Sequence, residues 1–215
     1  MTQPREFYER EYHFGEDVER PNLPRLRGAM RHLEPLPGAT FLDLGSGVGW
    51  ATHIAVRERH VGRAVGLDFS YRALTSAARL TPEAGWVDGD GTHLPFSNGT
   101  FDRVFSFGSM EHFPDIRAGF AEVFRVLKPG GLLVTAVPNF YIQTGQPLEF
   151  RATQSGWTSV MTSVGFVVDR VATDWGPALL KNRRPLRLLL RIALRLLSVI
   201  PPLRYQFVFV LRRPG

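Results

Sequence analysis

The sequence contains no cysteine among its 215 residues. Disulfide bonds, thiolate metal sites and a cysteine nucleophile are therefore excluded. The six histidines are scattered along the chain, so we expect no metal site. A chain without disulfides fits a reducing compartment, and we expect a cytoplasmic location.

Acidic residues are missing from the last part of the chain. None follows Asp174, whereas residues 181–215 hold nine of the 26 lysines and arginines. The rest of the chain carries 17 basic and 20 acidic residues, so the net charge of +6 comes from the C-terminal part. Enzymes that act on nucleic acid usually spread basic charge around the active site. The pattern therefore argues against a nucleic-acid partner.

Short apolar segments alternate with segments of helical periodicity, and 44% of the residues are hydrophobic, enough for one full core. Strands are predicted at residues 40–44, 63–67, 86–87, 101–107, 132–137, 165–173 and 206–211. Strands that alternate with helices indicate an α/β fold with a doubly wound, mainly parallel sheet. Ligands bind beyond the carboxyl ends of the strands in such a sheet.

A glycine-rich segment follows the first predicted strand. Residues 41–50 read FLDLGSGVGW, with Gly45, Gly47 and Gly49 before a segment of helical periodicity. Glycine lets backbone approach a ligand closely and takes positive φ at little cost. Backbone N–H groups at the start of a helix suit a carboxylate or a phosphate.

The spacing of this segment argues against a pyrophosphate. The dinucleotide pattern G-x-G-x-x-G needs a third glycine where Trp50 stands, and Gly49 comes one residue early. Asp43 precedes the first glycine by two residues, which suits a ligand that carries an ammonium and a sulfonium. Asp68 follows Gly49 by 19 residues and ends the second strand, where a carboxylate accepts hydrogen bonds from a ribose diol. Asp90 ends the third strand, in reach of an adenine amine.

Four segments in this order and spacing resemble class I S-adenosylmethionine-dependent methyltransferases of the small-molecule type found in ubiquinone and menaquinone biosynthesis. They are DLGSGVG at 43–49, GLD at 66–68, GDGTHLPFSNGTFDRVFSFGSMEHFPD at 89–115 and RVLKPGGLLVTAVPN at 125–139. The resemblance covers roughly residues 36–175. It implies S-adenosylmethionine as the cofactor and a Rossmann-like sheet of seven strands whose last strand is antiparallel. We place the methyltransferase domain at residues 36–215.

The resemblance also implies roles for individual residues. Asp43, Gly45 and Gly47 would hold the methionine end of the cofactor, and Ser46 stands where relatives often have cysteine. The ribose would be held by Asp68, beside Phe69. The other residues assigned to the cofactor are Asp90 and Gly91 at the adenine, and Phe107 and Gly108 on the methionine side.

Methyl transfer from a sulfonium is an in-line displacement, in which alignment of the acceptor supplies most of the catalysis. A base is needed only when the acceptor is a hydroxyl or another poorly ionised group. His112 is the candidate base because imidazole titrates near neutrality, with shaping of the pocket as the alternative. Tyr141 is a second catalytic candidate, which would orient the acceptor or simply pack. Substrate contacts are predicted for Glu111, which has a structural role as its alternative, and for Asn139 and Gln143.

Residues 1–35 are predicted to form an N-terminal helical lid. The segment FYEREYHF places aromatic residues near helical spacing. One interpretation is a lid over the cofactor, with Tyr12 or His13 near the substrate. The alternative is an aromatic face that packs on the domain.

A basic amphipathic helix is predicted at residues 184–200, inserted before the last strand. Its polar stripe contains Arg184, Arg187, Arg191, Arg195 and Ser198. The helix is too short and too charged to span a bilayer, which needs about 20 apolar residues. Three interpretations stay open: packing on its own domain or in a homodimer, contact with a membrane surface or a lipid-linked acceptor, and binding of an anionic substrate group.

The sequence thus predicts an S-adenosylmethionine-dependent methyltransferase for a small-molecule acceptor, most simply at oxygen, in a biosynthetic pathway. The first alternative is an RNA or protein methyltransferase, which basic charge along the cleft would favour. The second is a cofactor-binding scaffold without transfer activity. A nicotinamide oxidoreductase is disfavoured by Trp50 and Asp43. Without cysteine, methylation of a nucleobase carbon through a protein thiolate is excluded.

Overall fold

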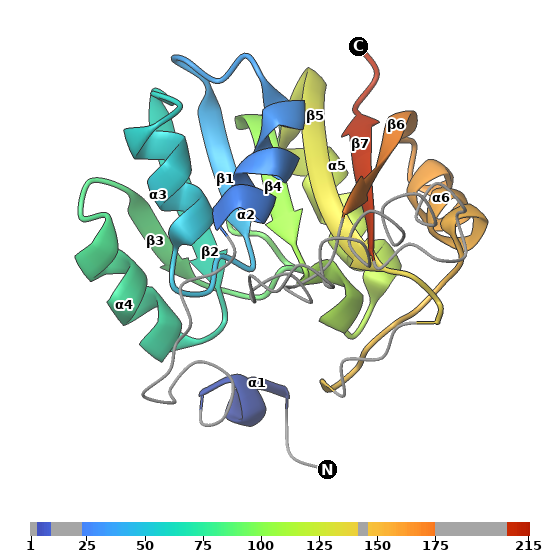
Figure 1. Cartoon of the computed structure of the whole chain (residues 1–215), viewed down its shortest axis with the longest axis horizontal. Helices are drawn as coiled ribbons and strands as arrows, with labels where there is room; N and C mark the ends of the chain where they lie inside the picture. The colour runs from blue at the N-terminus through green and yellow to red at the C-terminus, as the bar shows by residue number, and fades with distance from the viewer. Residues whose placement is uncertain (1–3, 10–22, 142–145, 175–205) are drawn as a thin grey trace, which may run out of the picture.

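The computed structural model describes residues 4–9, 23–141, 146–174 and 206–215. A seven-stranded sheet forms its centre and helices cover both faces (Figure 1). The strands lie in the order β3-β2-β1-β4-β5-β7-β6. Their bounds are Thr40–Leu44 (β1), Arg63–Asp68 (β2), Gly85–Asp88 (β3), Phe101–Phe107 (β4), Leu127–Pro138 (β5), Val167–Asp174 (β6) and Gln206–Arg212 (β7). The predicted doubly wound, Rossmann-like α/β fold is confirmed.

The strand directions agree with the predicted mainly parallel sheet. Strands β1, β2, β3, β4 and β5 pair in parallel, whereas β7 is antiparallel to both of its neighbours, β5 and β6. The last strand is therefore antiparallel, as predicted. Strand β5 begins earlier than the predicted residue 132, because Leu127 pairs with Phe101 and Gly130 N donates to the carbonyl of Arg213.

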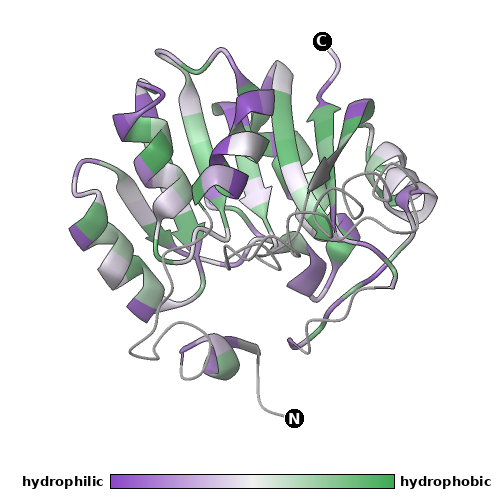
Figure 2. Ribbon diagram, in the orientation of Figure 1, coloured by the Kyte–Doolittle hydropathy of each residue, from purple (hydrophilic) through white to green (hydrophobic). Residues whose placement is uncertain are grey.

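Two apolar layers hold the helices on the sheet. One face is covered by α2 (Leu23–Met30) and α3 (Trp50–Arg57), and the other by α5 (Ile116–Val126) and α6 (Gln154–Ser163). Helix α4 (Tyr71–Leu80) contacts β2 and β3. Figure 2 shows the apolar strands between helices whose outer sides are polar. Burial of these apolar side chains supplies the main driving force for the fold.

Polar residues define where three of the helices begin. Ser70 accepts a hydrogen bond from Ala73 N at the start of α4, and Asp115 and Thr153 do the same for α5 and α6. Such side chains satisfy N–H groups that have no partner within the helix. Ser70 and Asp115 thereby determine where the loops that follow β2 and β4 end. These two loops carry much of the site.

The two described parts of the N-terminal region lie in different places. Helix α2 and the short 3₁₀ turn η2 (Arg31–Leu33) are part of the core, where Met30 and Leu33 are fully buried. The short helix α1 (Pro4–Phe7) instead lies beyond the carboxyl ends of the parallel strands (Figure 1). Of these two described parts, only α1 therefore has the position that a lid requires.

The carboxyl edge of the sheet is also where residues 175–205 leave and rejoin the described chain. Asp174 at the end of β6 pairs with Gln206 at the start of β7. The predicted helix at 184–200 lies outside the described residues. Within the part of the chain that the structure describes, no helix is long and apolar enough to cross a membrane.

Candidate functional site

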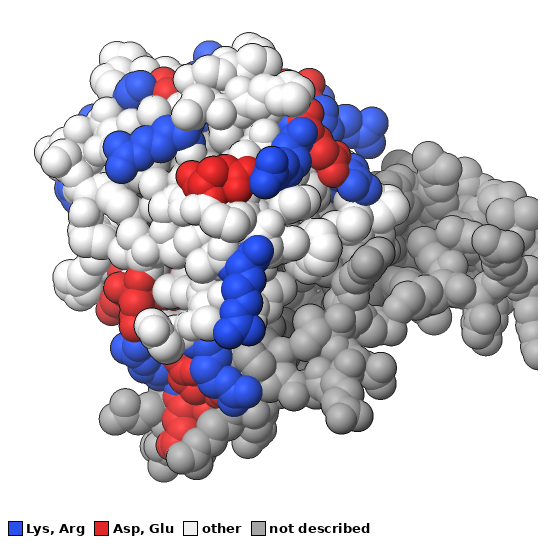
Figure 3. Space-filling view, turned by 90° about the vertical axis from the view of Figure 1, so that its left-hand side faces the viewer, with Lys and Arg blue, Asp and Glu red and all other residues white. Residues whose placement is uncertain are grey.

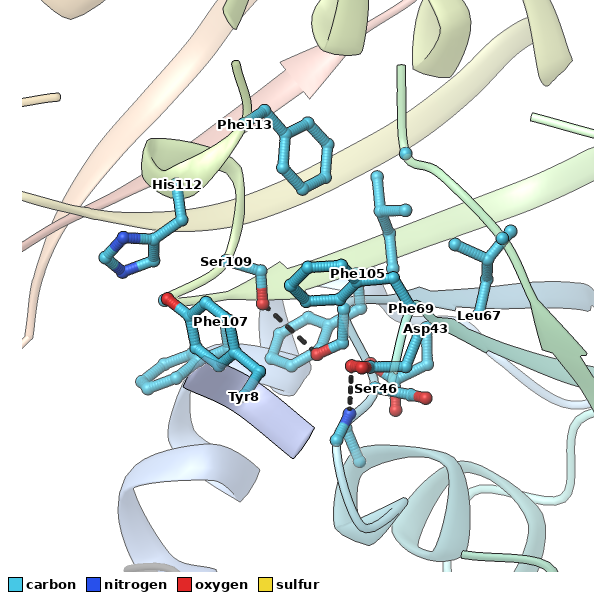
Figure 4. A pocket seen from close by; sticks show the side chains of 18 of the residues that line it. Tyr8, Asp43, Ser46, Leu67, Phe69, Phe105, Phe107, Ser109, His112 and Phe113 are labelled. Atoms are coloured by element: carbon cyan, nitrogen blue, oxygen red, sulfur yellow. Dashed lines mark hydrogen bonds between the residues drawn. The ribbon is translucent and has the colours of Figure 1, made fainter. Parts of the chain in front are cut away.

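A cavity of about 840 Å³ opens at the carboxyl ends of β1, β2 and β4 (Figure 4). Its lining includes the glycine-rich segment after β1, the residues that follow β2 and β3, the end of β4, and Tyr8. Eleven predicted site residues lie around it: Asp43, Gly45, Ser46, Gly47, Asp68, Phe69, Asp90, Gly91, Phe107, Gly108 and His112. The parallel order of the strands brings these residues from four separate segments to one edge.

The glycine-rich segment has a backbone that other residues adopt with difficulty. Gly45 and Gly49 have φ values of 70° and 84°. A Cβ atom on Gly45 would lie 2.2 Å from Oγ of Ser109, and that hydroxyl donates a hydrogen bond of 3.1 Å to the carbonyl of Gly45. Ser109, which follows β4, therefore locks this segment in place.

The N–H groups of this segment are turned toward the protein. Those of Gly45 and Ser46 donate to the carbonyl of Leu67 at 2.8 and 3.0 Å, and that of Gly47 donates to Oδ2 of Asp68 at 2.8 Å. They are thus occupied by β2 and its last residue. A phosphate-binding loop instead directs its N–H groups at the ligand. The geometry agrees with the argument from spacing that this is not a pyrophosphate site.

Two buried carboxylates lie at the cavity. Asp68 accepts from Gly47 N and, at 2.9 Å, from Ser70 N, and its burial raises the pKa of the carboxyl. Asp43 accepts from N and Oγ1 of Thr52 at 3.0 and 2.8 Å, and burial raises the pKa of Asp43 to about 7. A cation in the cavity would offset the cost of burying these charges.

The residues present fit S-adenosylmethionine. Two carboxylates match its positive charges and its ribose, and Oγ of Ser46 is buried with no hydrogen-bond partner among the described residues. The aromatic rings of Phe105 and Phe107 stack at 5.9 Å along one wall. A Cβ atom at Gly91 would lie 2.2 Å from the ring of Phe113, so a larger residue there would displace this ring of the cavity lining.

Asp90 occupies a more open place than the other two acids. Its Oδ1 accepts from N and Oγ1 of Thr92, both at 2.8 Å, and its pKa is lowered despite partial burial because of these bonds and His93. The carboxyl is therefore ionised at neutral pH. An ionised and exposed acceptor suits the rim of the cavity, where an exocyclic amine would be held.

His112 lies in the short 3₁₀ turn η3 (Met110–His112) and is half-buried at the cavity. Its Nδ1 is 2.9 Å from the carbonyl oxygen of Pro147. A carbonyl can only accept, so Nδ1 carries the proton and Nε2 carries the lone pair. Burial lowers the pKa of His112, which keeps the ring neutral at pH 7. A neutral imidazole with the lone pair on Nε2 is the form that a general base needs.

Three predicted residues lie away from the cavity lining. Glu111 and Asn139 are 3% and 2% exposed and buried outside it, and Tyr141 is 66% exposed on the surface, against Phe140. Oε2 of Glu111 has no hydrogen-bond partner among the described residues, and burial raises the pKa of Glu111 to about 8. Tyr12, His13 and Gln143 lie outside the described residues.

Three residues of the site were not predicted. Tyr8 belongs to the aromatic N-terminal segment from which we singled out Tyr12 and His13. Ser109 and Phe113 lie inside the segment 89–115 that carries the resemblance, but their roles depend on contacts with Gly45 and Gly91. No pattern along the chain signals such contacts. Among the residues that the structure describes, no three histidine or acidic side chains are grouped as metal ligands.

Comparisons with known proteins agree with the site. A family model described as "Methyltransferase domain" matches residues 42–135. A demethylmenaquinone methyltransferase of Beutenbergia cavernae is 38% identical over 130 residues, which are 59% of this chain and 53% of the relative. A 2-methyl-6-phytyl-1,4-hydroquinone methyltransferase of Synechocystis sp. is 35% identical over 117 residues, 53% of this chain and 36% of the relative. The chain thus spans about half or less of the length of these relatives.

Solved structures show the same fold. Phosphoethanolamine N-methyltransferase 2 of Haemonchus contortus, in complex with S-adenosyl-L-methionine, superposes with a TM-score of 0.73 at 18% identity, covering 100% of this chain and 61% of that one. An S-adenosylmethionine-dependent methyltransferase of Mesorhizobium loti superposes with a TM-score of 0.67 at 19% identity, covering 88% and 96%. Residues 42–135 thus match a methyltransferase domain, and the motifs, the cavity, the relatives and the fold are all similar to those of class I S-adenosylmethionine-dependent methyltransferases.

Proposed function

We propose that this protein transfers a methyl group from S-adenosylmethionine to a small-molecule acceptor in a biosynthetic pathway. The observation that carries the proposal is the combination in one cavity of two buried carboxylates, Asp43 and Asp68, with the neutral imidazole of His112. When bound, the cofactor supplies an electrophilic methyl group on a good leaving group. The protein has to hold the acceptor in line and remove its proton.

His112 is the proposed base. Its Nδ1–H is held by the carbonyl of Pro147, so Nε2 takes the proton from an acceptor hydroxyl. Imidazolium formed in this way keeps its hydrogen bond to Pro147, and Glu149 contributes a favourable charge interaction. The role parallels that of other histidine bases, which are oriented by the hydrogen bond of their second nitrogen.

A hydroquinone is the proposed acceptor class. The relatives are named as methyltransferases of demethylmenaquinone, of 2-methyl-6-phytyl-1,4-hydroquinone and of 2-phytyl-1,4-naphthoquinone. The hydroxyl of a hydroquinone is weakly acidic, which fits an acceptor that needs a base. Once the proton is removed, the oxygen becomes the nucleophile for methyl transfer.

The second candidate reaction is transfer to a ring carbon of the same acceptor. Removal of the hydroxyl proton by His112 places negative charge on the ring carbons ortho and para to the oxygen as well as on the oxygen. The same base therefore serves either outcome. Alignment with the methyl group decides between them, and the methyl chemical shift of the product distinguishes an oxygen-bound from a carbon-bound methyl group.

The acceptor is further proposed to carry an apolar tail and to be presented at a membrane surface. Exposed apolar side chains follow β5, which ends at the carboxyl edge of the sheet, among them Phe140, Tyr141 and Leu148 at 50%, 66% and 49%. The segment 175–205 also starts and ends at this edge and contains basic but no acidic residues. These features favour a cytoplasmic protein that contacts an anionic membrane surface.

The charge distribution does not favour a nucleic-acid substrate. On the side that carries α3 and α4, basic and acidic side chains are interspersed among the described residues (Figure 3). The exposed ion pairs Arg57–Glu83 and Arg5–Asp88 belong to this surface. A nucleic-acid site would instead present a field of one sign.

Calorimetric titration and a transfer assay test the proposal. The protein should bind S-adenosylmethionine and its demethylated product, but not NADH. With methyl-labelled cofactor, label should pass to a prenylated naphthohydroquinone and less to the same ring without its tail. Failure to bind the cofactor would refute the proposal. Label that passes to RNA or to a protein, but to no hydroquinone, would refute the small-molecule acceptor.

A further inference from the structure

We propose that Tyr8 is a positioning residue for His112, acting through Gln146 and Pro147. The inference rests on the proposed role of His112 as the base. It joins the N-terminal segment, the chain after β5 and the turn after β4 in one chain of contacts. Figure 4 shows Tyr8 and His112 next to each other at the cavity.

The first contact links Tyr8, which directly follows α1, to the segment after β5. Tyr8 is 7% exposed, and its hydroxyl donates a hydrogen bond of 3.0 Å to Oε1 of Gln146, 138 positions along the chain. Its ring lies edge-on to the His112 ring, with centroids 6.0 Å apart, and contacts Phe69 at 5.2 Å. A buried tyrosine whose hydroxyl has a specific partner has one defined orientation.

The second contact passes from this segment to the base. Gln146 directly precedes Pro147 in the chain. The carbonyl of Pro147 accepts a hydrogen bond of 2.9 Å from the Nδ1–H of His112. Proline has a nearly fixed φ, and the residue before it is restricted to extended conformations. The position of Pro147, and with it that of its carbonyl, therefore follows the placement of Gln146, which Tyr8 holds.

The segment 146–150 is supported at both ends. The backbone N–H of Phe150 donates a hydrogen bond of 2.8 Å to the carbonyl of Glu111, the residue that precedes His112. Between the two supports, Leu148 has a φ of 57°, a conformation that non-glycine residues adopt only at a cost. Such a backbone depends on its surroundings to persist. Loss of the support at Gln146 is therefore expected to move the Pro147 carbonyl.

Helix α1 does not depend on the Tyr8 hydroxyl for its own attachment. Arg5 pairs with Asp88 at 2.6 Å, and Oε1 of Glu9 accepts from Tyr71 N at 2.6 Å. Both contacts reach the cofactor side of the cavity. Removing the hydroxyl alone should therefore leave α1 and the cofactor site in place and disturb only the support of His112.

Tyr8→Phe tests the proposal. Cofactor affinity and KM for the cofactor should change less than about twofold, while kcat falls about tenfold or more, as expected for misplaced catalytic groups. Tyr71→Phe is the matched control, because Tyr71 is 66% exposed. Gln146→Met removes the acceptor instead of the donor and should reproduce the loss. In the double variant the two losses should not add, because they break the same contact.

Nitrogen-15 NMR of the histidine rings gives a readout that needs no acceptor. The wild-type His112 ring, measured in the protein with S-adenosylmethionine, should show one tautomer with the proton on Nδ1. Tyr8→Phe and Gln146→Met should show a mixture. A single unchanged tautomer, with an unchanged kcat, in both variants would overturn the proposal. A tautomer shift in a protein that methylates no acceptor would support the positioning role and refute the proposed reaction instead.

Discussion

The carboxylate of Asp68 accepts a hydrogen bond of 2.8 Å from the backbone N–H of Gly47, 21 positions earlier in the chain. Its other oxygen accepts from Ser70 N, the residue that caps α4. One buried side chain thereby holds the glycine-rich segment and the turn after β2 together. The lone pairs that remain on the two oxygens are where hydroxyl groups of a ribose would bind.

Asp68→Ala should weaken binding of S-adenosylmethionine by about 1.5–3 kcal/mol, the value of a charge-assisted hydrogen bond. It should also lower the melting temperature, since two buried N–H groups lose their acceptor. Calorimetric titration and thermal unfolding measure the two effects. Asp169→Ala, which breaks the exposed pair with Arg212, is the control for charge removal. An unchanged cofactor affinity in Asp68→Ala would refute the ribose assignment.

Gly45→Ala should abolish cofactor binding. The new Cβ would lie 2.2 Å from Oγ of Ser109, so the segment or Ser109 has to move. Gly130→Ala is a matched control, because Gly130 has a similar φ of 76° but nothing within 4 Å of the position of its Cβ. Backbone strain should cost both variants about 1 kcal/mol of stability, and the clash with Ser109 adds to this cost in Gly45→Ala. Only Gly45→Ala should lose binding, and equal affinities in the two variants would contradict the role of the Ser109 contact.

Cofactor affinity should depend on pH through Asp43. Burial raises the pKa of Asp43 to about 7, and only the ionised carboxyl attracts a cation. Affinity should therefore rise about tenfold per unit as pH increases toward 7 and level off above it. Binding near pH 6 should release a proton, which titrations in buffers of different ionisation enthalpy detect. Asp43→Asn should bind more weakly and without this pH dependence, whereas a flat wild-type profile from pH 5 to 8 would be inconsistent with the assignment.

Glu111→Gln should stabilise the protein at alkaline pH. Burial raises the pKa of Glu111 from 4.5 to about 8, so the folded state binds more protons than the unfolded state between these values. Wild-type stability therefore falls as pH rises from about 4.5 to about 8. Glutamine has no charge to bury, and the variant should be more stable by on the order of 3 kcal/mol at pH 8, with no such gain at pH 4. Denaturant unfolding at both pH values, with Glu83→Gln as the exposed control, tests this.

His112→Asn should remove the base while keeping the support. The asparagine amide is able to donate to the Pro147 carbonyl in place of Nδ1–H, but it has no counterpart of Nε2. We expect kcat to fall about 10²-fold or more, with cofactor affinity changed less than about twofold. Single-turnover transfer measures the loss of rate, and calorimetry measures the cofactor affinity. Full activity of His112→Asn would contradict the role of His112 as the base and would leave alignment of the acceptor as the main source of catalysis.

Much of the fold and the cofactor side of the site could be predicted. Strands β1 and β4 have the predicted bounds, because each is a short apolar run with turn residues on both sides. Asp43, Asp68 and Asp90 lie at the cavity because each is within two residues of the carboxyl end of a parallel strand, and parallel strands end at one edge. The substrate contacts stay predictions, since Glu111 and Asn139 are buried outside the cavity lining and Tyr141 is exposed.

The sequence by itself determined the order of the strands and helices, the glycine-rich segment and the acids that end the strands, because these depend on local pattern and spacing. Only the tertiary structure decided that Ser109 locks Gly45, that Glu111 is buried without a partner among the described residues, and that Tyr8 meets His112 through Gln146 and Pro147. These contacts join residues far apart in the chain. No local pattern encodes them, because they form only when the sheet brings the separate loops to one edge.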